Sequence, residues 1–292
     1  GASAQLAMLN RYGEHYKALV TGTGAAPIAA FGRSVAVWDA SPTHALALRV
    51  AASALPQAEQ EEIYRCIESY LVRRAVCGLS RKNYNKVFAQ QLRRLIEADL
   101  NAASFRKALT ALTGEASRWP GDEEFRRQWL DGSVYPGRLD APKLRTVFHR
   151  LETEIRTEKT EEPIPLALDS LDIDHILPQS WYTYWPLADG TKVSSDEALV
   201  AAPMRYMTEG VDAKSQSILK RQDAVPRIGN LTLVHYGVNR ALQNHAFDAK
   251  RKALFEPSNL QLNRGLMQLA AWDEAAIEVR GEALLKAALR IW

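Results

Sequence analysis

The sequence is poor in cysteine and has no long apolar run. Its 292 residues include two cysteines, Cys66 and Cys77, whose positions match neither a metal-ligand spacing nor a disulfide framework. This usage predicts a protein of the reducing cytoplasm. No stretch has enough consecutive apolar residues to cross a bilayer, and the N-terminus lacks the pattern of a secretory signal peptide. These absences argue against a membrane-spanning protein and against a disulfide-stabilised secreted domain.

A large excess of one charge is also absent from the chain as a whole. The formal net charge is +3, which excludes a polycation. Basic residues nevertheless gather in two regions, and acids dominate between residues 152 and 174. The upstream region contains Arg73, Arg74, Arg81, Lys82, Lys86, Arg93 and Arg94, and the downstream region contains Lys214, Lys220, Arg221, Arg227, Arg240, Lys250, Arg251 and Lys252. Clusters of basic residues are typical of surfaces that bind phosphate. Any single cluster could equally be the solvated face of a helix.

Helical spacing dominates the chain before residue 157. Apolar residues recur at helical intervals in five segments, and start and stop signals such as Asp140 and Gly78 bound some of them. The predicted helices are 57–76, 84–100, 102–112, 122–130 and 141–155. The Glu-rich stretch 157–165 reads as a linker. The chain starts Gly1-Ala2 without Met, from which we expect a piece of a longer protein.

Two later segments have the short alternation of β-strands. In the first, Leu171 and Ile173 alternate with aspartates and Pro178 ends the pattern; the second runs over 230–234. Helical spacing returns over 238–252. Strand geometry turns neighbouring side chains to opposite sides of the backbone. The sequence therefore predicts an α+β fold that is mainly α-helical, with strand, connection, strand and helix in its later part.

The connection between the two strands is too long for a plain hairpin. Residues 180–227 must hold structure of their own, and helices are expected at 194–200 and 215–222. Four aromatic residues open this insert, namely Trp181, Tyr182, Tyr184 and Trp185. We expect them to pack the insert onto the core rather than to stack on bases, because aromatic side chains dominate cores.

The residues on and after the two strands carry a specific pattern. Asp174 precedes His175 directly, Asn230 begins the second strand, and Asn239 follows nine residues later. This spacing resembles the ββα-metal site of HNH endonucleases. Three segments resemble one branch of these enzymes, the C-terminal HNH domain of GmrSD-type restriction endonucleases, which include phosphorothioation-sensing relatives. The segments are Asp-His-Ile-Leu-Pro-Gln-Ser, Ile-Gly-Asn-Leu-Thr-Leu, and Asn239 followed by Asn244, Phe247 and Lys250. The upstream run 70–78 also resembles the helical region before that domain.

The resemblance implies a function and an organisation. These bacterial enzymes cut modified invading DNA, so the chain would be a metal-dependent endonuclease that nicks or cleaves double-stranded DNA as the effector of a restriction and antiviral defence protein. A linked N-terminal sensing or nucleotide-hydrolysing domain is implied as well, but its Asp-Gly-Gln-Gln-Arg-type motif is absent here. The expected divisions are an N-terminal segment at 1–56, a helical domain at 57–165, the HNH module at 166–255 and a C-terminal helical segment at 256–292.

The chemistry of phosphodiester hydrolysis assigns a role to each residue. Asp174 offers an anionic oxygen and Asn239 a neutral amide oxygen, a sparse donor set that suits Mg²⁺, with Mn²⁺ as a substitute. The ordinary pKa of a histidine lies near neutrality, so His175 could act as the general base. Asn230 would fix the connection between the strands and so orient His175. Contacts with DNA phosphates are expected from Arg240, Lys250, Arg251 and Lys252.

Several alternatives stay open at this point. Asn239 could instead cap a helix with its side chain, and His245 is the rival metal ligand because neutral imidazole also binds divalent ions. Two other functions compete with the nuclease. One is a nucleic-acid-binding module whose HNH site has decayed, and the other is a helical interaction domain in which Asp174 and His175 are structural.

Overall fold

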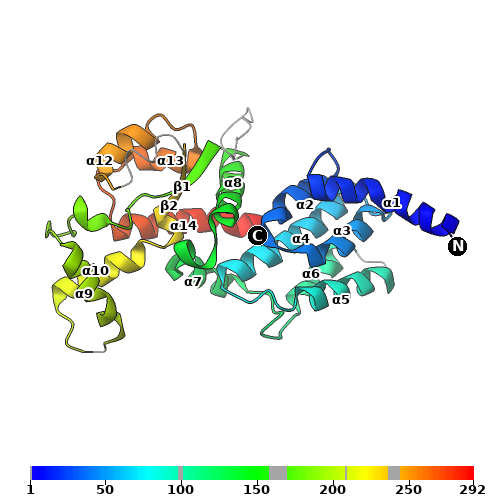
Figure 1. Cartoon of the computed structure of the whole chain (residues 1–292), viewed down its shortest axis with the longest axis horizontal. Coiled ribbons are helices and arrows are strands. Elements are labelled where there is room, and N and C mark those ends of the chain that lie inside the picture. Colours follow the sequence, from blue (N-terminus) through cyan, green and yellow to red (C-terminus); the bar gives the residue numbers. More distant parts are fainter. Residues whose placement is uncertain (1, 98–100, 158–169, 208, 236–243) are drawn as a thin grey trace. The chain divides into compact units, whose positions relative to one another are not determined.

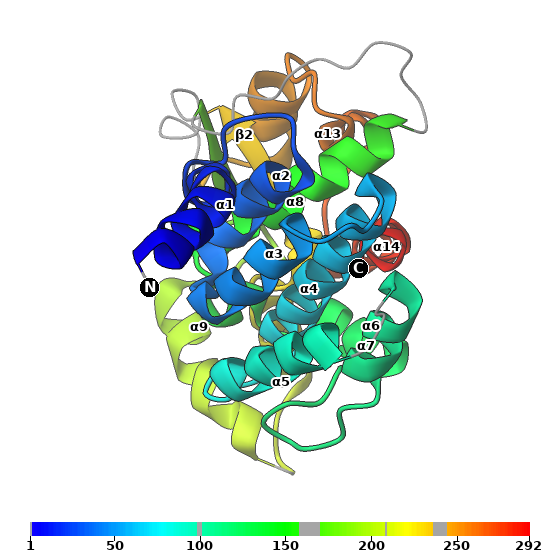
Figure 2. The same ribbon diagram turned by 90° about the vertical axis from the view of Figure 1, so that its right-hand side faces the viewer.

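The computed structural model describes residues 2–97, 101–157, 170–207, 209–235 and 244–292 (Figures 1 and 2). The chain divides within a helix into two compact units, residues 1–125 with Trp292, and residues 126–291. The predicted divisions at 57, 166 and 256 do not fall at this boundary and stay predictions. No helix within the described ranges is long and apolar enough to cross a membrane.

The first unit is built from helices. Helix α1 lies along α2, and α2 packs against α4 (Figure 2). The elements are α1 (Ala2–Thr21), α2 (Pro27–Val35), η1 (Ala36–Trp38), η2 (Ser41–Thr43), α3 (His44–Ala51), α4 (Gln57–Val76), α5 (Tyr84–Glu97), α6 (Ala102–Thr110) and the start of α7 (Asp122–Asp131), where η marks short 3₁₀ or π segments. The predictions for α4 to α7 are confirmed to within a few residues, apart from 98–100, which lie outside the described residues.

Helix α4 is the centre of this unit. Ile63, Ile67 and Tyr70 recur at helical spacing and are fully buried. The helix ends where Gly78 adopts a positive φ of 69°, a conformation that glycine takes without steric cost. The sequence therefore fixes both the buried face and the end of this helix.

Two cations of the upstream basic region are part of the fold rather than of the surface. Arg73 donates to the carbonyl oxygen of Pro120 at 3.0 Å and forms an ion pair with Asp122. Arg74 is fully buried and donates to the carbonyl oxygen of Arg118 at 2.7 Å. These bonds fix the segment between α6 and α7 against α4. Of the upstream region, only the residues from Arg81 onward remain on the surface.

The second unit contains the sheet. Strands β1 (Leu171–His175) and β2 (Leu231–His235) pair antiparallel, with Ile173 opposite Leu233 at the centre. Helices α8 and α13 contact this sheet, and α14 contacts the turn before β2 (Figure 1). The other elements are η3 (Val134–Arg138), α8 (Ala141–Thr157), η5 (Trp181–Thr183), α9 (Ser195–Ala201), η6 (Ala202–Tyr206), α10 (Ala213–Ala224), η7 (Ile228–Asn230), α12 (Phe247–Lys250), η8 (Arg251–Phe255), α13 (Gln261–Arg264), η9 (Gly265–Gln268) and α14 (Glu274–Ile291).

The long connection holds its own helices, as predicted. Helices α9 and α10 lie close to the predicted ranges. Trp181 and Trp185 are buried in one apolar cluster with Phe247 and Trp272, which confirms that they pack the insert onto the core. Tyr184 is 53% exposed, so this residue does not take part in that packing. The structure thus anchors the insert at its aromatic start.

The helix predicted over 238–252 differs from what is observed. Residues 236–243 lie outside the described residues, and residues 244–246 are not helical. Helix α12 begins after Ala246, whose ψ of 156° is extended. The helical prediction extended across this break because Ala246 and Ala249 fit the apolar spacing of a helix, whether or not Ala246 is helical. The strand pair is therefore observed, whereas the helix that would carry Asn239 is not described.

Candidate functional site

Strand β1 directs its two candidate residues to different partners. Asp174 lies opposite Thr232 of β2 and His175 lies opposite Leu231, at the end of the sheet. Because side chains alternate along a strand, the carboxylate and the imidazole leave the backbone on opposite sides. Asp174 meets Lys250 of α12, and His175 meets Tyr135 of η3. The predicted alternation of the two side chains is thus present in the backbone geometry, and their roles stay predictions.

A buried ion pair holds Asp174. The Lys250 ammonium lies 2.9 and 3.2 Å from the two carboxylate oxygens and 2.6 Å from the carbonyl oxygen of His175. The side chains are 0% and 7% exposed, so these three acceptors satisfy the three ammonium donors away from water. Burial raises the pKa of Asp174 and lowers the pKa of Lys250, and the attraction between their charges opposes both shifts.

A backbone carbonyl orients His175. Its Nε2 lies 3.1 Å from the carbonyl oxygen of Tyr135, and the two rings stack with centroids 5.6 Å apart. Burial lowers the pKa of His175 from 6.5 to about 4, against the effect of the Tyr135 bond, so the imidazole is neutral at pH 7. Since a carbonyl oxygen accepts and never donates, the single proton must be on Nε2. The lone pair is therefore on Nδ1, the nitrogen able to accept a proton.

The amide of Asn230 closes the connection between the strands. Its oxygen accepts from the backbone N–H of Leu177 at 2.8 Å and from the indole N–H of Trp272 at 3.0 Å. Its nitrogen donates to the carbonyl oxygens of Leu177 and Val225, each at 2.9 Å. All four hydrogen-bonding positions of a fully buried amide are used. The side chain thus fixes the backbone that follows His175.

The turn that carries Asn230 fits closely against α14. A Cβ on Gly229 would lie 2.1 Å from the carbonyl oxygen of Ile277, so only glycine allows this approach. Arg280 of α14 donates to the carbonyl oxygens of Gly229 at 2.7 Å and Leu231 at 2.6 Å. Packing against α14 therefore accounts for the Ile-Gly-Asn motif, because α14 contacts the residues on both sides of Asn230.

An open cleft of about 370 Å³ borders the site. It is lined by Tyr135, Asp172, Ile173, Asp174, His175, Pro178, Gln179, Ser180 and Asn244. The lining joins carboxylate, amide and hydroxyl oxygens to the imidazole. Within the described residues, no group of three or more His, Cys, Asp or Glu side chains could hold a metal ion.

The sequence profile of the C-terminal domain of GmrSD restriction endonucleases matches residues 119–287, which is more than half of the chain. The chain belongs to this family. No curated protein matches it. The GmrSD match contains every residue of the site described above. It does not reach the upstream run 70–78, so that part of the resemblance stays a prediction.

The two alternative ligand positions, Asn239 and His245, both lie within the GmrSD region. Asn239 and Arg240 lie outside the described residues, and their roles stay predictions. His245, the rival ligand, is exposed and stacks on Tyr184 with ring centroids 5.6 Å apart. Among the described residues that line the cleft, Asn244 is present and His245 is not. The assignment of His245 as a metal ligand therefore stays a prediction as well.

The basic residues predicted to contact DNA near the site are only partly on the surface. Lys250 is fully buried against Asp174, so the expectation that it meets a phosphate directly disagrees with this structure. Arg251 pairs with Asp248 and Glu256, which reduces its net attraction for phosphate. Lys252 is exposed, and its contact with DNA stays a prediction. The sequence did not show which of Lys250, Arg251 and Lys252 is buried, because three consecutive helical residues point in three different directions.

Sequence reasoning missed three contributors to the GmrSD site. Tyr135 acts through a backbone carbonyl, which leaves no signal in residue type. Asn244 was noted only as part of the family motif, and Lys250 was expected to contact DNA rather than Asp174. A useful signal for Lys250 was present, since a buried aspartate such as Asp174 needs a cation and Phe247 placed Lys250 one turn from the core.

Proposed function

We propose that this chain is an HNH-type, metal-dependent DNA endonuclease domain, the effector part of a bacterial restriction and defence protein whose sensing is supplied by an N-terminal domain. Membership of a restriction endonuclease family supports nuclease activity. The observation that carries the HNH assignment is the hydrogen bond between His175 Nε2 and the carbonyl of Tyr135. It leaves a neutral imidazole with a free lone pair on Nδ1 beside a cleft that contains Asp174.

In this mechanism His175 is the general base. Its Nδ1 accepts a proton from the water that attacks the phosphorus of the scissile phosphodiester. The Tyr135 carbonyl keeps the ring in the required tautomer and accepts from Nε2–H more strongly once the ring is charged. Asn230 keeps the backbone after His175 in place through its two bonds to Leu177. Lys250 holds the Asp174 carboxylate in one orientation.

The donor set of the cleft fits a magnesium ion. Mg²⁺ prefers oxygen ligands, usually keeps several waters and is held by one or two carboxylates rather than by a full protein cage. Asp174 uses two hydrogen bonds toward Lys250, and a carboxylate has about four acceptor positions. Asp174 would hold the ion, with Asn239 as the second protein ligand and Asp172 or Asn244 within the same lining. When bound, the ion would neutralise charge on the phosphoryl and leaving oxygens.

A digest of supercoiled plasmid tests the proposed function. We expect the purified chain to convert supercoiled plasmid to nicked or linear DNA with Mg²⁺ or Mn²⁺ and to stop in EDTA, because the leaving oxygen needs a cation. Agarose gels at several times give the rate. Binding of the same plasmid without cleavage in any metal would contradict the proposal and support a decayed HNH module. Neither binding nor cleavage would support a helical interaction domain.

The metal ligands are tested by their rank order. We expect Asp174→Asn to raise the Mn²⁺ concentration for half-maximal cleavage most, since it removes the charge, and Asn239→Ala to raise it less. His245→Ala is the matched control and should not change it, because His245 stacks on Tyr184 rather than lining the cleft. Titration calorimetry with Mn²⁺ gives the affinity without cleavage. If His245→Ala loses Mn²⁺ and Asn239→Ala keeps it, the ligand is His245.

A further inference from the structure

Helix α5 has an exposed face of positive charge without acidic partners. From Arg81 to Ile96 the sequence contains no Asp or Glu. Lys82, Lys86, Arg93 and Arg94 are exposed, and no ion pair involves any of them in the part of the chain that the structure describes. The α5 basic face is defined here as Lys82, Lys86, Gln90, Arg93 and Arg94. Many other exposed cations do pair, as in Arg65 with Glu62 and Lys214 with Glu197.

This charge arrangement is unfavourable for the helix itself. Lys82 and Lys86 flank the start of α5, where the helix dipole favours negative rather than positive charge. Lys82 lies in the turn before the helix and Lys86 in its first turn, so two like charges stand at the same helix end and repel each other. The first turn contains no acidic residue to offset either effect. An anion bound at this face would relieve both repulsions.

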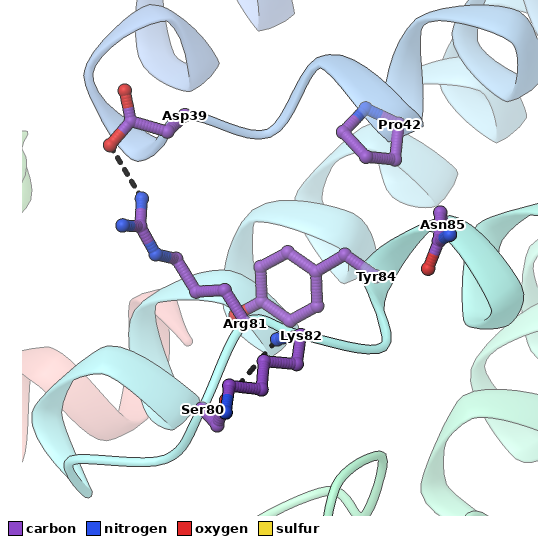
Figure 3. Close-up of a pocket in the computed structure, with 7 residues that line it drawn as sticks. All are labelled: Asp39, Pro42, Ser80, Arg81, Lys82, Tyr84 and Asn85. Atoms are coloured by element: carbon purple, nitrogen blue, oxygen red, sulfur yellow. Dashed lines mark hydrogen bonds and ion pairs between the residues drawn. The ribbon is translucent and has the colours of Figure 1, made fainter.

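Three adjoining hollows lie on or beside this face. One hollow lies at the start of α5 and is lined by Ser80, Arg81, Lys82 and Tyr84 among others (Figure 3). A second is lined by Lys86, Ala89, Gln90, Arg93 and Arg94, and a third, more apolar one lies toward Phe88 and Leu92. Asn85 lines all three, so they adjoin. In Figure 3 the Arg81 guanidinium points to Asp39, with which it pairs. Arg81 is therefore left out of the α5 basic face.

We propose that the α5 basic face binds the phosphate backbone of duplex DNA without reading its sequence. A helix of 14 residues is about 21 Å long, a length over which a duplex presents roughly twelve phosphate charges. The lysine, arginine and amide groups along the face are the groups that donate to phosphate oxygens. The identity of the polyanion rests on the proposed nuclease function. The face itself lies outside the matched GmrSD residues.

Binding in EDTA tests this proposal apart from cleavage. The full chain with Lys82→Ala, Lys86→Ala and Arg93→Ala is compared with a control of equal charge, Lys17→Ala, Arg65→Ala and Lys286→Ala, whose residues are exposed on three other helices. The probe is a fluorescent 30-base-pair duplex of arbitrary sequence, measured by anisotropy from 50 to 300 mM salt. Each lost phosphate contact flattens the slope of log K against log salt by about 0.9, so the α5 variant should be flatter by about 2–3.

The control should keep nearly the wild-type slope, and both variants should keep the wild-type circular dichroism spectrum. Equal affinity and slope for the two variants, or no duplex binding by the wild type, would overturn the proposal. A chain that binds through α5 but cuts no plasmid in any metal would contradict the nuclease function alone. A chain that cuts plasmid while the α5 variant binds normally would contradict the α5 proposal alone.

Discussion

His175→Ala should lower the rate of plasmid cleavage by about 10²- to 10⁴-fold, because a positioned general base contributes about that much. His175→Gln should lose as much, since glutamine fills part of the space but accepts no proton. The measurement is the initial nicking rate at saturating Mn²⁺. DNA binding in EDTA should stay near the wild-type value, because the imidazole faces the Tyr135 carbonyl and the cleft rather than an exposed basic surface.

His235 provides the matched control for this variant. It is the last residue of β2, it is exposed, and it lies opposite Leu171 at the far end of the strand pair from His175. His235→Ala should cleave at the wild-type rate. If His175→Ala nicks plasmid as fast as His235→Ala, His175 is not the base, and the function of the Tyr135 contact is structural.

Lys250→Met should lower the free energy of unfolding by about 3–5 kcal/mol. Methionine keeps much of the volume but leaves the Asp174 carboxylate buried without its counter-charge, and breaking a buried pair on one side costs about this much. The measurement is urea unfolding followed by circular dichroism. The carbonyl oxygen of His175 loses its 2.6 Å donor as well, so the effect should include the end of β1.

Lys252→Met and a double variant complete the test of this pair. Lys252 lies two residues further and is exposed, so its substitution should change the free energy of unfolding by no more than about 0.5 kcal/mol. Adding Asp174→Asn to Lys250→Met should recover part of the loss, because the unpaired charge is then removed. Equal unfolding curves for Lys250→Met and Lys252→Met would show that the ion pair does not stabilise the fold.

The sequence predicted the elements better than the contacts. Helix α4 was predicted to the residue because its apolar spacing and the Gly78 stop signal agree. The strand pair was predicted from two runs of only five residues, since the apolar Leu171 and Ile173 of β1 alternate with Asp172 and Asp174. The predicted helix over 238–252 failed at 244–246, where a local bend has no signature in hydrophobicity.

Contacts between distant segments account for the remaining errors. Residue type made Lys250 a DNA contact, whereas Asp174, far away in the sequence, draws it into the core. Arg73 and Arg74 were grouped with surface cations, although backbone carbonyls accept their hydrogen bonds. Charge alone does not distinguish a buried arginine with enough acceptors from an exposed one. Asn230 was expected to hold the connection between the strands, and its amide makes four hydrogen bonds. Residue type was informative here because a buried amide must find hydrogen-bond partners.

The amide of Asn230 has a consequence for how the domain can diversify. It joins Leu177 to Val225, the two ends of the long insert, so the insert is closed at its base by one side chain. The entropy of closing a loop rises only slowly with its length, by about 0.6 kcal/mol for each doubling. The part of the insert at η6 has no buried residue and exposes Tyr206, although Ala198 and Ala201 of the preceding α9 pack into the core cluster. Relatives could therefore lengthen, shorten or exchange that part while His175 keeps its position.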